Sequence, residues 1–221
     1  MPLHVWVPAA GSGPGILLIQ EIFGVGAYIR SVAERLMDAG YVVGAPEVFW
    51  RFAPGWQADH DQAGLEASIA KVGQLDPATA ALDCAKALAT LDALDEVEGR
   101  PGVMGYCLGG TLAWAVAAGN DPAVCVSYYG SGIPTMLDDL AQVTCPLLLH
   151  FGSLDPYIPG AAVEALTAAT AGQRNVVINV EIAGHAFDNH EAPMFYAESA
   201  AKAAWAKTLA FLGEHLPAPT A

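Results

Sequence analysis

Positive charge is scarce in this sequence. Its 221 residues include 9 Lys and Arg against 23 Asp and Glu, which gives a formal net charge of −14. Nucleic-acid binding requires clustered Lys and Arg to neutralise phosphates, so the balance argues against a nucleic-acid partner and against an anionic membrane surface. A small anionic substrate is not excluded, because one local arginine can override the overall field.

Long apolar runs are lacking as well. Although 54% of the residues are hydrophobic, no run reaches the roughly 18–20 residues that a membrane-spanning helix needs. The first ten residues, MPLHVWVPAA, lack a basic stretch followed by an apolar one, so no secretory signal is predicted. We therefore expect a cytoplasmic protein without a membrane partner.

Paired cysteine motifs are also absent. The 4 cysteines are spread along the chain without a C-x-x-C pair, so we expect free thiols rather than disulfides. Cys84 lies on a helical pattern, and Cys125 and Cys145 lie within or beside apolar runs, which indicates a structural role. Cys107 differs from these three because it stands between glycines.

What the sequence does contain is a regular alternation of short apolar runs with longer helical patterns. This alternation predicts one α/β domain over residues 1–221, with a mostly parallel, doubly wound sheet flanked by helices. Residues 51–76 mix Pro, Gly, Trp and charges, which predicts a lid-like insertion, and residues 216–221 are expected to form a frayed tail. The predicted strands are 15–20, 41–49, 100–106, 123–130, 146–152 and 176–184, and the predicted helices are 28–40, 77–94 (with Asp76 as N-cap), 108–119, 159–172 and 194–213.

The stretch GVMGYCLGG (102–110) carries a G-x-C-x-G pattern, with Gly105 and Gly109 on either side of Cys107. The serine version of this pattern marks the sharp strand-to-helix turn of α/β-hydrolases. Asp155 and His185 each follow a predicted strand, and the carboxyl ends of parallel strands meet at one edge of the sheet. The order Cys107, Asp155, His185 is the nucleophile–acid–base order of the α/β-hydrolase fold, so we predict a catalytic triad.

Each predicted triad residue has a defined chemical role. Cys107 stands at the start of a predicted helix, whose unpaired N–H groups favour a thiolate. His185 can accept a proton and return it to a leaving group, and Asp155 can orient the imidazole and stabilise its cation. The two glycines, having no Cβ, allow the strand and the helix to approach closely around the turn.

Glu21 ends the first apolar run, close to the expected site. In this fold the loop at that strand end supplies one N–H of the oxyanion hole, here that of Ile22, beside the N–H of Leu108. Two roles remain open for Glu21. Its carboxylate either controls the protonation of the Cys107 thiol or only fixes the loop by hydrogen bonds.

No metal or cofactor is expected. His60 and His190 are predicted to be surface groups, because HAFDNH lacks the spacing of a zinc motif and no cysteine ligand is nearby. The segment GSGPG (11–15) is predicted to be a turn, since no G-K-S/T follows it.

The chain resembles the dienelactone hydrolase family in the pieces QEIFGVGAYIR, GYVVGAPEVFWR, VMGYCLGG, YYG, LDP and AGHAF, which extend over nearly its whole length. The resemblance implies a cysteine hydrolase that acts on a small lactone or activated ester through a thioester on the cysteine. It further implies that the thiol is neutral at rest and loses its proton through the glutamate that matches Glu21.

The sequence departs from this family at its substrate-binding positions. The best-known members bind a carboxylated dienelactone with two arginines; at one of these positions this chain has Asn189, and residues 52–70 contain no arginine for the other. For the second arginine, His60 is the nearest residue that can carry a positive charge, and Arg51 is a possible substitute. Phe187 is a further candidate for substrate contact. We therefore expect weaker preference for carboxylated substrates.

Three other functions remain open. One is a general carboxylesterase or thioesterase that acts on uncharged esters. A second is a non-catalytic protein that binds a small ligand and has lost the triad geometry. A redox-sensing thiol is disfavoured, because no resolving cysteine is close to Cys107 in the sequence. We expect a monomer.

Overall fold

A computed structural model describes residues 1–218, which form one seven-stranded sheet in the order β1-β3-β2-β4-β5-β6-β7. Strand β1 pairs with β3 antiparallel, and all other pairs are parallel. The predicted α/β architecture with a mostly parallel sheet is therefore confirmed. The strands are β1 (Leu3–Trp6), β2 (Gly15–Ile19), β3 (Val42–Pro46), β4 (Gly102–Tyr106), β5 (Cys125–Tyr128), β6 (Leu147–Gly152) and β7 (Val176–Glu181).

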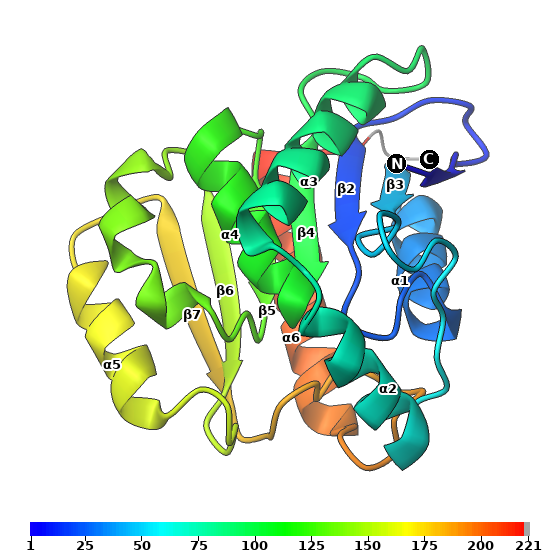
Figure 1. The fold of residues 1–221 in the computed structure, drawn as a ribbon. Coiled ribbons are helices and arrows are strands. Elements are labelled where there is room, and N and C mark those ends of the chain that lie inside the picture. The colour runs from blue at the N-terminus through cyan, green and yellow to red at the C-terminus, as the bar shows by residue number, and fades with distance from the viewer. Residues whose placement is uncertain (219–221) are drawn as a thin grey trace.

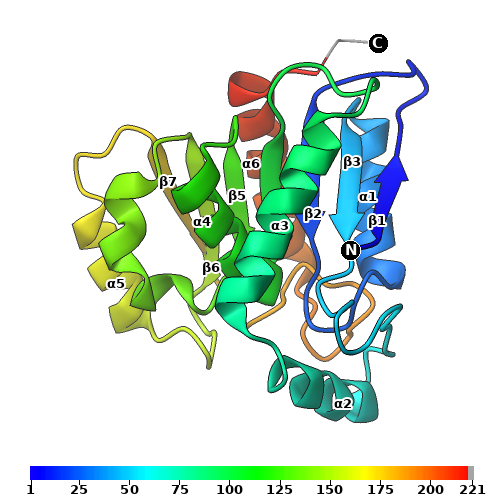
Figure 2. The same ribbon diagram turned by 45° about the horizontal axis from the view of Figure 1, so that its top comes forward.

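Helices cover both faces of the sheet (Figure 1). Helices α3 and α4 lie on one face, and α1 and α6 lie on the other (Figures 1 and 2). Every residue of β2 to β6 is buried, as expected for parallel strands that are covered on both sides. The helices are α1 (Ala27–Asp38), α2 (Gln62–Val72), α3 (Pro77–Asp92), α4 (Leu108–Asn120), α5 (Gly160–Ala169) and α6 (Glu198–His215), with short 3₁₀ helices at Ile133–Thr135 and Leu137–Gln142.

One strand and one α-helix were absent from the sequence prediction, besides the two short 3₁₀ helices. Strand β1 has only four residues, and it is defined by its pairing with β3 rather than by a local pattern. Helix α2 lies within the predicted insertion and packs beyond the carboxyl ends of the strands, apart from both helix layers (Figure 2). Its N-cap is Asp61, whose side chain accepts a hydrogen bond from the Gly64 N–H at 2.8 Å.

The chain ends differ slightly from expectation. Helix α6 begins at Glu198, four residues later than predicted, and ends at His215. Leu216, expected in the frayed tail, is buried in the hydrophobic core, while residues 219–221 of that tail lie outside the described residues. Asp76 does cap α3, accepting a hydrogen bond from the Thr79 N–H at 2.9 Å.

Within residues 1–218 no helix combines the length and the apolar character needed to cross a membrane. The three cysteines outside the G-x-C-x-G pattern are free and buried, as predicted. They are Cys84, Cys125 and Cys145.

Candidate active site

Cys107 lies at the turn between β4 and α4, with a φ of 52° and a ψ of −114°. A non-glycine residue at positive φ stores strain of roughly 1–3 kcal/mol, which the surrounding packing must hold in place. The two flanking glycines make this packing possible. A Cβ on Gly105 would lie 2.0 Å from the Gly109 oxygen, and a Cβ on Gly109 would lie 2.2 Å from the Ile19 oxygen. The expected close approach of strand and helix is confirmed.

Asp155 and His185 reach Cys107 from the loops after β6 and β7. His185 Nε2 lies 3.1 Å from the Cys107 Sγ, and His185 Nδ1 lies 2.7 Å from the Asp155 Oδ2. The other carboxylate oxygen of Asp155 accepts the backbone N–H of Tyr157 at 2.8 Å. These contacts fix the imidazole between a thiol and a carboxylate.

The electrostatic environment of His185 favours the imidazolium. Burial lowers the pKa of this side chain, but hydrogen bonds to Asp155 and Cys107, with the charges of both groups, outweigh burial and raise the pKa to about 10. The side chain of His185 is only 10% exposed, so water screens these interactions weakly. At neutral pH these contacts favour an imidazolium between the Asp155 carboxylate and the Cys107 sulfur.

Glu21 is 2% exposed and lies in the wall of the cavity that also contains Cys107. Its Oε1 lies 2.9 Å from the His60 Nε2 and accepts a hydrogen bond from the Asn189 Nδ2 at 2.8 Å. The ring of His60 also packs on Phe23, with centroids 4.3 Å apart. His60 and Asn189, two candidate substrate-binding residues, thus hold Glu21 instead. His60 is also not the predicted surface group, since its side chain is only 8% exposed.

Ile22 and Leu108, the two residues expected to form the oxyanion hole, both line this cavity. Leu108 is the first residue of α4, and the N–H of a first helical residue has no acceptor within its own helix. The Ile22 peptide is held by Trp56, whose Nε1 donates to the Ile22 oxygen at 3.3 Å. Both residues therefore lie at the cavity that contains the Cys107 thiol, Ile22 after β2 and Leu108 at the start of α4.

The cavity at Cys107 has a volume of about 350 Å³ and a mostly apolar wall. Among the described residues that line it there is no Lys or Arg, and Glu21 is its one carboxylate. The apolar wall was not predicted from the sequence, although an i, i+4, i+7 spacing of apolar residues in 65–72 was a detectable signal. The lining comprises Glu21, Ile22, Phe23, Leu65, Ile69, Val72, Pro77, Cys107, Leu108, Thr111, Leu112, Ser131, Gly132, Tyr157, His185, Ala186 and Phe195.

Comparison with known proteins matches this architecture to one family. A sequence model of the dienelactone hydrolase family matches residues 3–216. The chain belongs to the dienelactone hydrolase family. It is 31% identical over 218 residues to a carboxymethylenebutenolidase of Pseudomonas sp. strain P51, covering 98% of this chain and 91% of that protein. A carboxymethylenebutenolidase of Cupriavidus pinatubonensis strain JMP 134 is 32% identical over 206 residues, covering 93% of this chain and 88% of its own length.

Solved structures agree with the sequence relation. A candidate dienelactone hydrolase from Klebsiella pneumoniae superposes with a TM-score of 0.81 at 28% identity, covering 97% of this chain and 93% of that one. The protein is therefore a carboxymethylenebutenolidase-like hydrolase.

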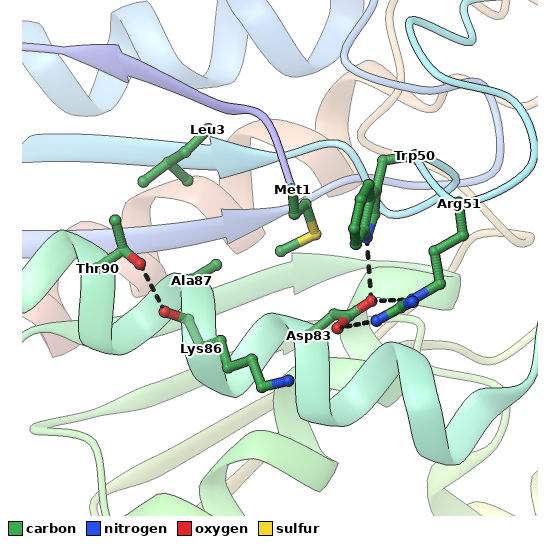
Figure 3. Close-up of a pocket in the computed structure, with 8 residues that line it drawn as sticks. All are labelled: Met1, Leu3, Trp50, Arg51, Asp83, Lys86, Ala87 and Thr90. Atoms are coloured by element: carbon green, nitrogen blue, oxygen red, sulfur yellow. Dashed lines mark hydrogen bonds and ion pairs between the residues drawn. The ribbon is translucent and has the colours of Figure 1, made fainter.

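Arg51 was offered as a possible substitute for a substrate-binding arginine, but it does not line the cavity at Cys107. It pairs with Asp83, with Nε 2.7 Å from Oδ2 and Nη2 2.9 Å from Oδ1, and the Trp50 Nε1 donates to the same carboxylate at 3.0 Å (Figure 3). These residues border a separate hollow of about 260 Å³ that shares no lining residue with the cavity at Cys107. A substrate contact for Arg51 is therefore not supported.

Phe187 also departs from its expected role. The side chain is fully buried, and its ring packs against Tyr129 with centroids 5.2 Å apart, so it belongs to the core beneath the site. His190 is partly exposed, as expected of a surface group, and lies 3.3 Å from the Ser31 hydroxyl. In the part of the chain that the structure describes, no three His, Cys, Asp or Glu side chains gather as metal ligands.

Proposed function

We propose that this member of the family hydrolyses lactones or activated esters with Cys107 as the nucleophile, through a thioester on that residue. The observation that carries the proposal is the continuous chain of contacts from the Cys107 Sγ through His185 to Asp155, at 3.1 and 2.7 Å. Thiol, base and orienting carboxylate within contact distance are the geometry that nucleophilic acyl transfer requires.

The reaction proceeds in two halves. The Cys107 Sγ attacks the carbonyl carbon, His185 delivers its proton to the leaving oxygen, and the acyl group remains on sulfur as a thioester. Water then attacks the thioester carbon and gives a proton to His185, and the thiolate leaves. The products are an acid and an alcohol, which are parts of a single molecule when the substrate is a lactone.

The N–H groups of Ile22 and Leu108 stabilise the oxyanion in both halves. Donors that are fixed before the reaction are worth about 2.7–4 kcal/mol each in comparable sites, because they do not have to reorganise as charge develops. The hydrogen bond from Trp56 to the Ile22 oxygen and the helical start at Leu108 supply that fixation here.

Glu21 acts by fixing the loop after β2. Within residues 1–218 the Glu21 carboxylate forms hydrogen bonds with His60 and Asn189, whereas the Cys107 thiol contacts His185. A gate that holds the thiol neutral would need the carboxylate to contact sulfur. The contacts therefore favour the loop-fixing alternative over the gate that the family resemblance implied.

Two of the alternative functions, a non-catalytic binding protein and a redox sensor, receive less support. A binding protein without catalysis presupposes lost triad geometry, which the two short contacts oppose. For a redox sensor, the three remaining cysteines are buried, with pKa values raised by burial, so they are poor resolving thiols.

Turnover of p-nitrophenyl acetate, together with intact-mass analysis of rapidly quenched enzyme, tests the mechanism. Wild-type enzyme should carry one acetyl group on Cys107, whereas Cys107→Ala should lose both the adduct and at least about a thousandfold in kcat/KM. Cys145→Ala, which removes a buried thiol, is the matched control and should retain both. Turnover by Cys107→Ala comparable to that of wild type would refute the mechanism.

A further inference from the structure

The buried residues of helix α2 are small, and its large apolar residues are only half-buried or exposed. Its buried positions are Gly64 and Ser68, and a Cβ on Gly64 would lie 1.9 Å from the Asp59 oxygen. Leu65, Ile69 and Val72, spaced i, i+4 and i+7, lie on one face of the helix. In most surface helices such an apolar stripe packs against the core. Here only Val72 packs against the core, while Leu65 is half-buried and Ile69 is exposed.

The stripe instead lines the cavity at Cys107. Ile69 is 55% exposed, and Phe23 and Phe195 continue the same apolar wall. Leaving apolar side chains uncovered forgoes stabilisation, and apolar patches of this kind mark binding surfaces. A wall of this composition beside a thiol favours an apolar group attached to the reacting carbonyl.

The charges around the cavity disfavour a carboxylated substrate. A second carboxylate there would face Glu21, and the donors of His60 and Asn189 already bind that residue. Lys71, the cation on α2, is directed toward Trp56, with its Nζ 4.9 Å from the ring centroid. An anionic group at the apolar wall would therefore be desolvated without a lysine or arginine partner.

We propose that the natural substrates are uncharged esters with an apolar acyl group, and that the stripe Leu65, Ile69 and Val72 of α2 determines this preference. The proposal rests on the proposed function, since it assumes that acyl transfer occurs at Cys107. Each methylene that enters the wall should raise kcat/KM by about two- to fourfold, where fourfold corresponds to ~0.8 kcal/mol per buried CH₂.

A matched ester series tests the substrate class. We expect kcat/KM for p-nitrophenyl hexanoate to exceed that for the acetate by on the order of ten- to a hundredfold. We also expect the hexanoate to exceed mono-p-nitrophenyl adipate, which has the same chain length with a terminal carboxylate, by at least about tenfold. A flat series, or preference for the adipate, would overturn the proposal.

Substitutions on α2 test the assigned residues. Ile69→Asn should reduce the ratio of kcat/KM for the hexanoate to that for the acetate by about fivefold or more. Ala67→Asn, at an exposed position of α2 outside the cavity lining, is the control and should leave the ratio unchanged. Ile69→Lys should bring the adipate closer to the hexanoate. An unchanged ratio in Ile69→Asn would exclude the stripe as the determinant.

The two proposals fail in different ways. Loss of the chain-length preference, with acetate turnover still dependent on Cys107, would overturn only the substrate class. Turnover that does not depend on Cys107 would overturn the mechanism, whatever the chain-length profile.

Discussion

Helices α1 and α2 use apolar residues in opposite ways. Along α1 the large side chains Ile29, Val32 and Leu36 are buried against the sheet, so its apolar stripe stabilises the fold. Along α2 the buried positions are small, and the large side chains face the cavity at Cys107. The same helical spacing therefore packs a stripe into the core in one helix and lines a cavity in the other.

Two histidines with little exposed side chain show how the body of the sheet differs from the edge where its parallel strands end. His150 on β6 is fully buried, and desolvation, with a smaller effect from Lys207, lowers its pKa to about 3. At the edge, the partners of His185 outweigh burial and raise its pKa to about 10. Burial alone does not decide the charge of a histidine; an adjacent anion does.

The largest effect is expected at the start of α4, and the other end of the same helix provides the control. Gly109→Ala should destabilise the protein by more than about 3 kcal/mol and lower activity by orders of magnitude, because the new Cβ would lie 2.2 Å from a backbone oxygen. Gly119→Ala in the same helix meets nothing within 4 Å and should stabilise by about 0.5–1 kcal/mol. Urea unfolding of both variants measures the contrast, and equal stabilities would contradict the close packing at the turn between β4 and α4.

Identical substitutions in α1 and α2 test the helix comparison directly. Ile29→Ala should cost about 2–5 kcal/mol of unfolding free energy, because Ile29 is 1% exposed in the core. Ile69→Ala should cost less than about 1 kcal/mol, because Ile69 is 55% exposed. Urea unfolding measures both values, and kcat/KM for p-nitrophenyl hexanoate should fall selectively in Ile69→Ala. Comparable destabilisation by the two variants would show that α2 also uses its stripe for folding.

The buried histidine of the sheet body should make stability depend on pH. Because the folded-state pKa of His150 is lowered to about 3 from an ordinary value of 6.5, the unfolded chain binds a proton below about pH 6.5 that the folded chain does not. This group's contribution is present above pH 6.5 and is lost toward pH 3, by about 1.4 kcal/mol per pH unit. The difference in unfolding free energy between wild type and His150→Gln should shrink accordingly. If this difference stays constant between pH 6.5 and pH 3, His150 takes up its proton equally in the folded and unfolded states, and its pKa is not lowered by folding.

The smallest effect is expected from Glu21, which distinguishes a loop anchor from a gate. Glu21→Gln should leave the rate of iodoacetamide alkylation of Cys107 at pH 7 within about threefold of wild type, whereas His185→Gln should slow alkylation by more than about tenfold. Intact-mass time courses measure both rates. Slow alkylation of wild-type enzyme that Glu21→Gln accelerates would restore the gating hypothesis.

Many of the strands and the residues that meet at Cys107 could be predicted from short-range sequence patterns. The continuous apolar runs anticipated the buried strands from β2 to β6, and the residues directly after two strands anticipated which side chains approach Cys107. Phe187 and Arg51 were interpreted less well. Phe187 follows the site histidine by two residues but turns into the core, and Arg51 finds a carboxylate on α3 that is distant in the sequence.

The sequence by itself determined the alternating α/β framework, the glycine-flanked thiol and the order of the three residues that meet there, because each depends on short-range periodicity or on the ends of strands. Only the tertiary structure decided that β1 joins the sheet, that Glu21 binds His60 and Asn189, and that the stripe of α2 faces a cavity. These features depend on contacts between segments far apart in the chain. An apolar stripe looks the same in sequence whether a core or a ligand covers it.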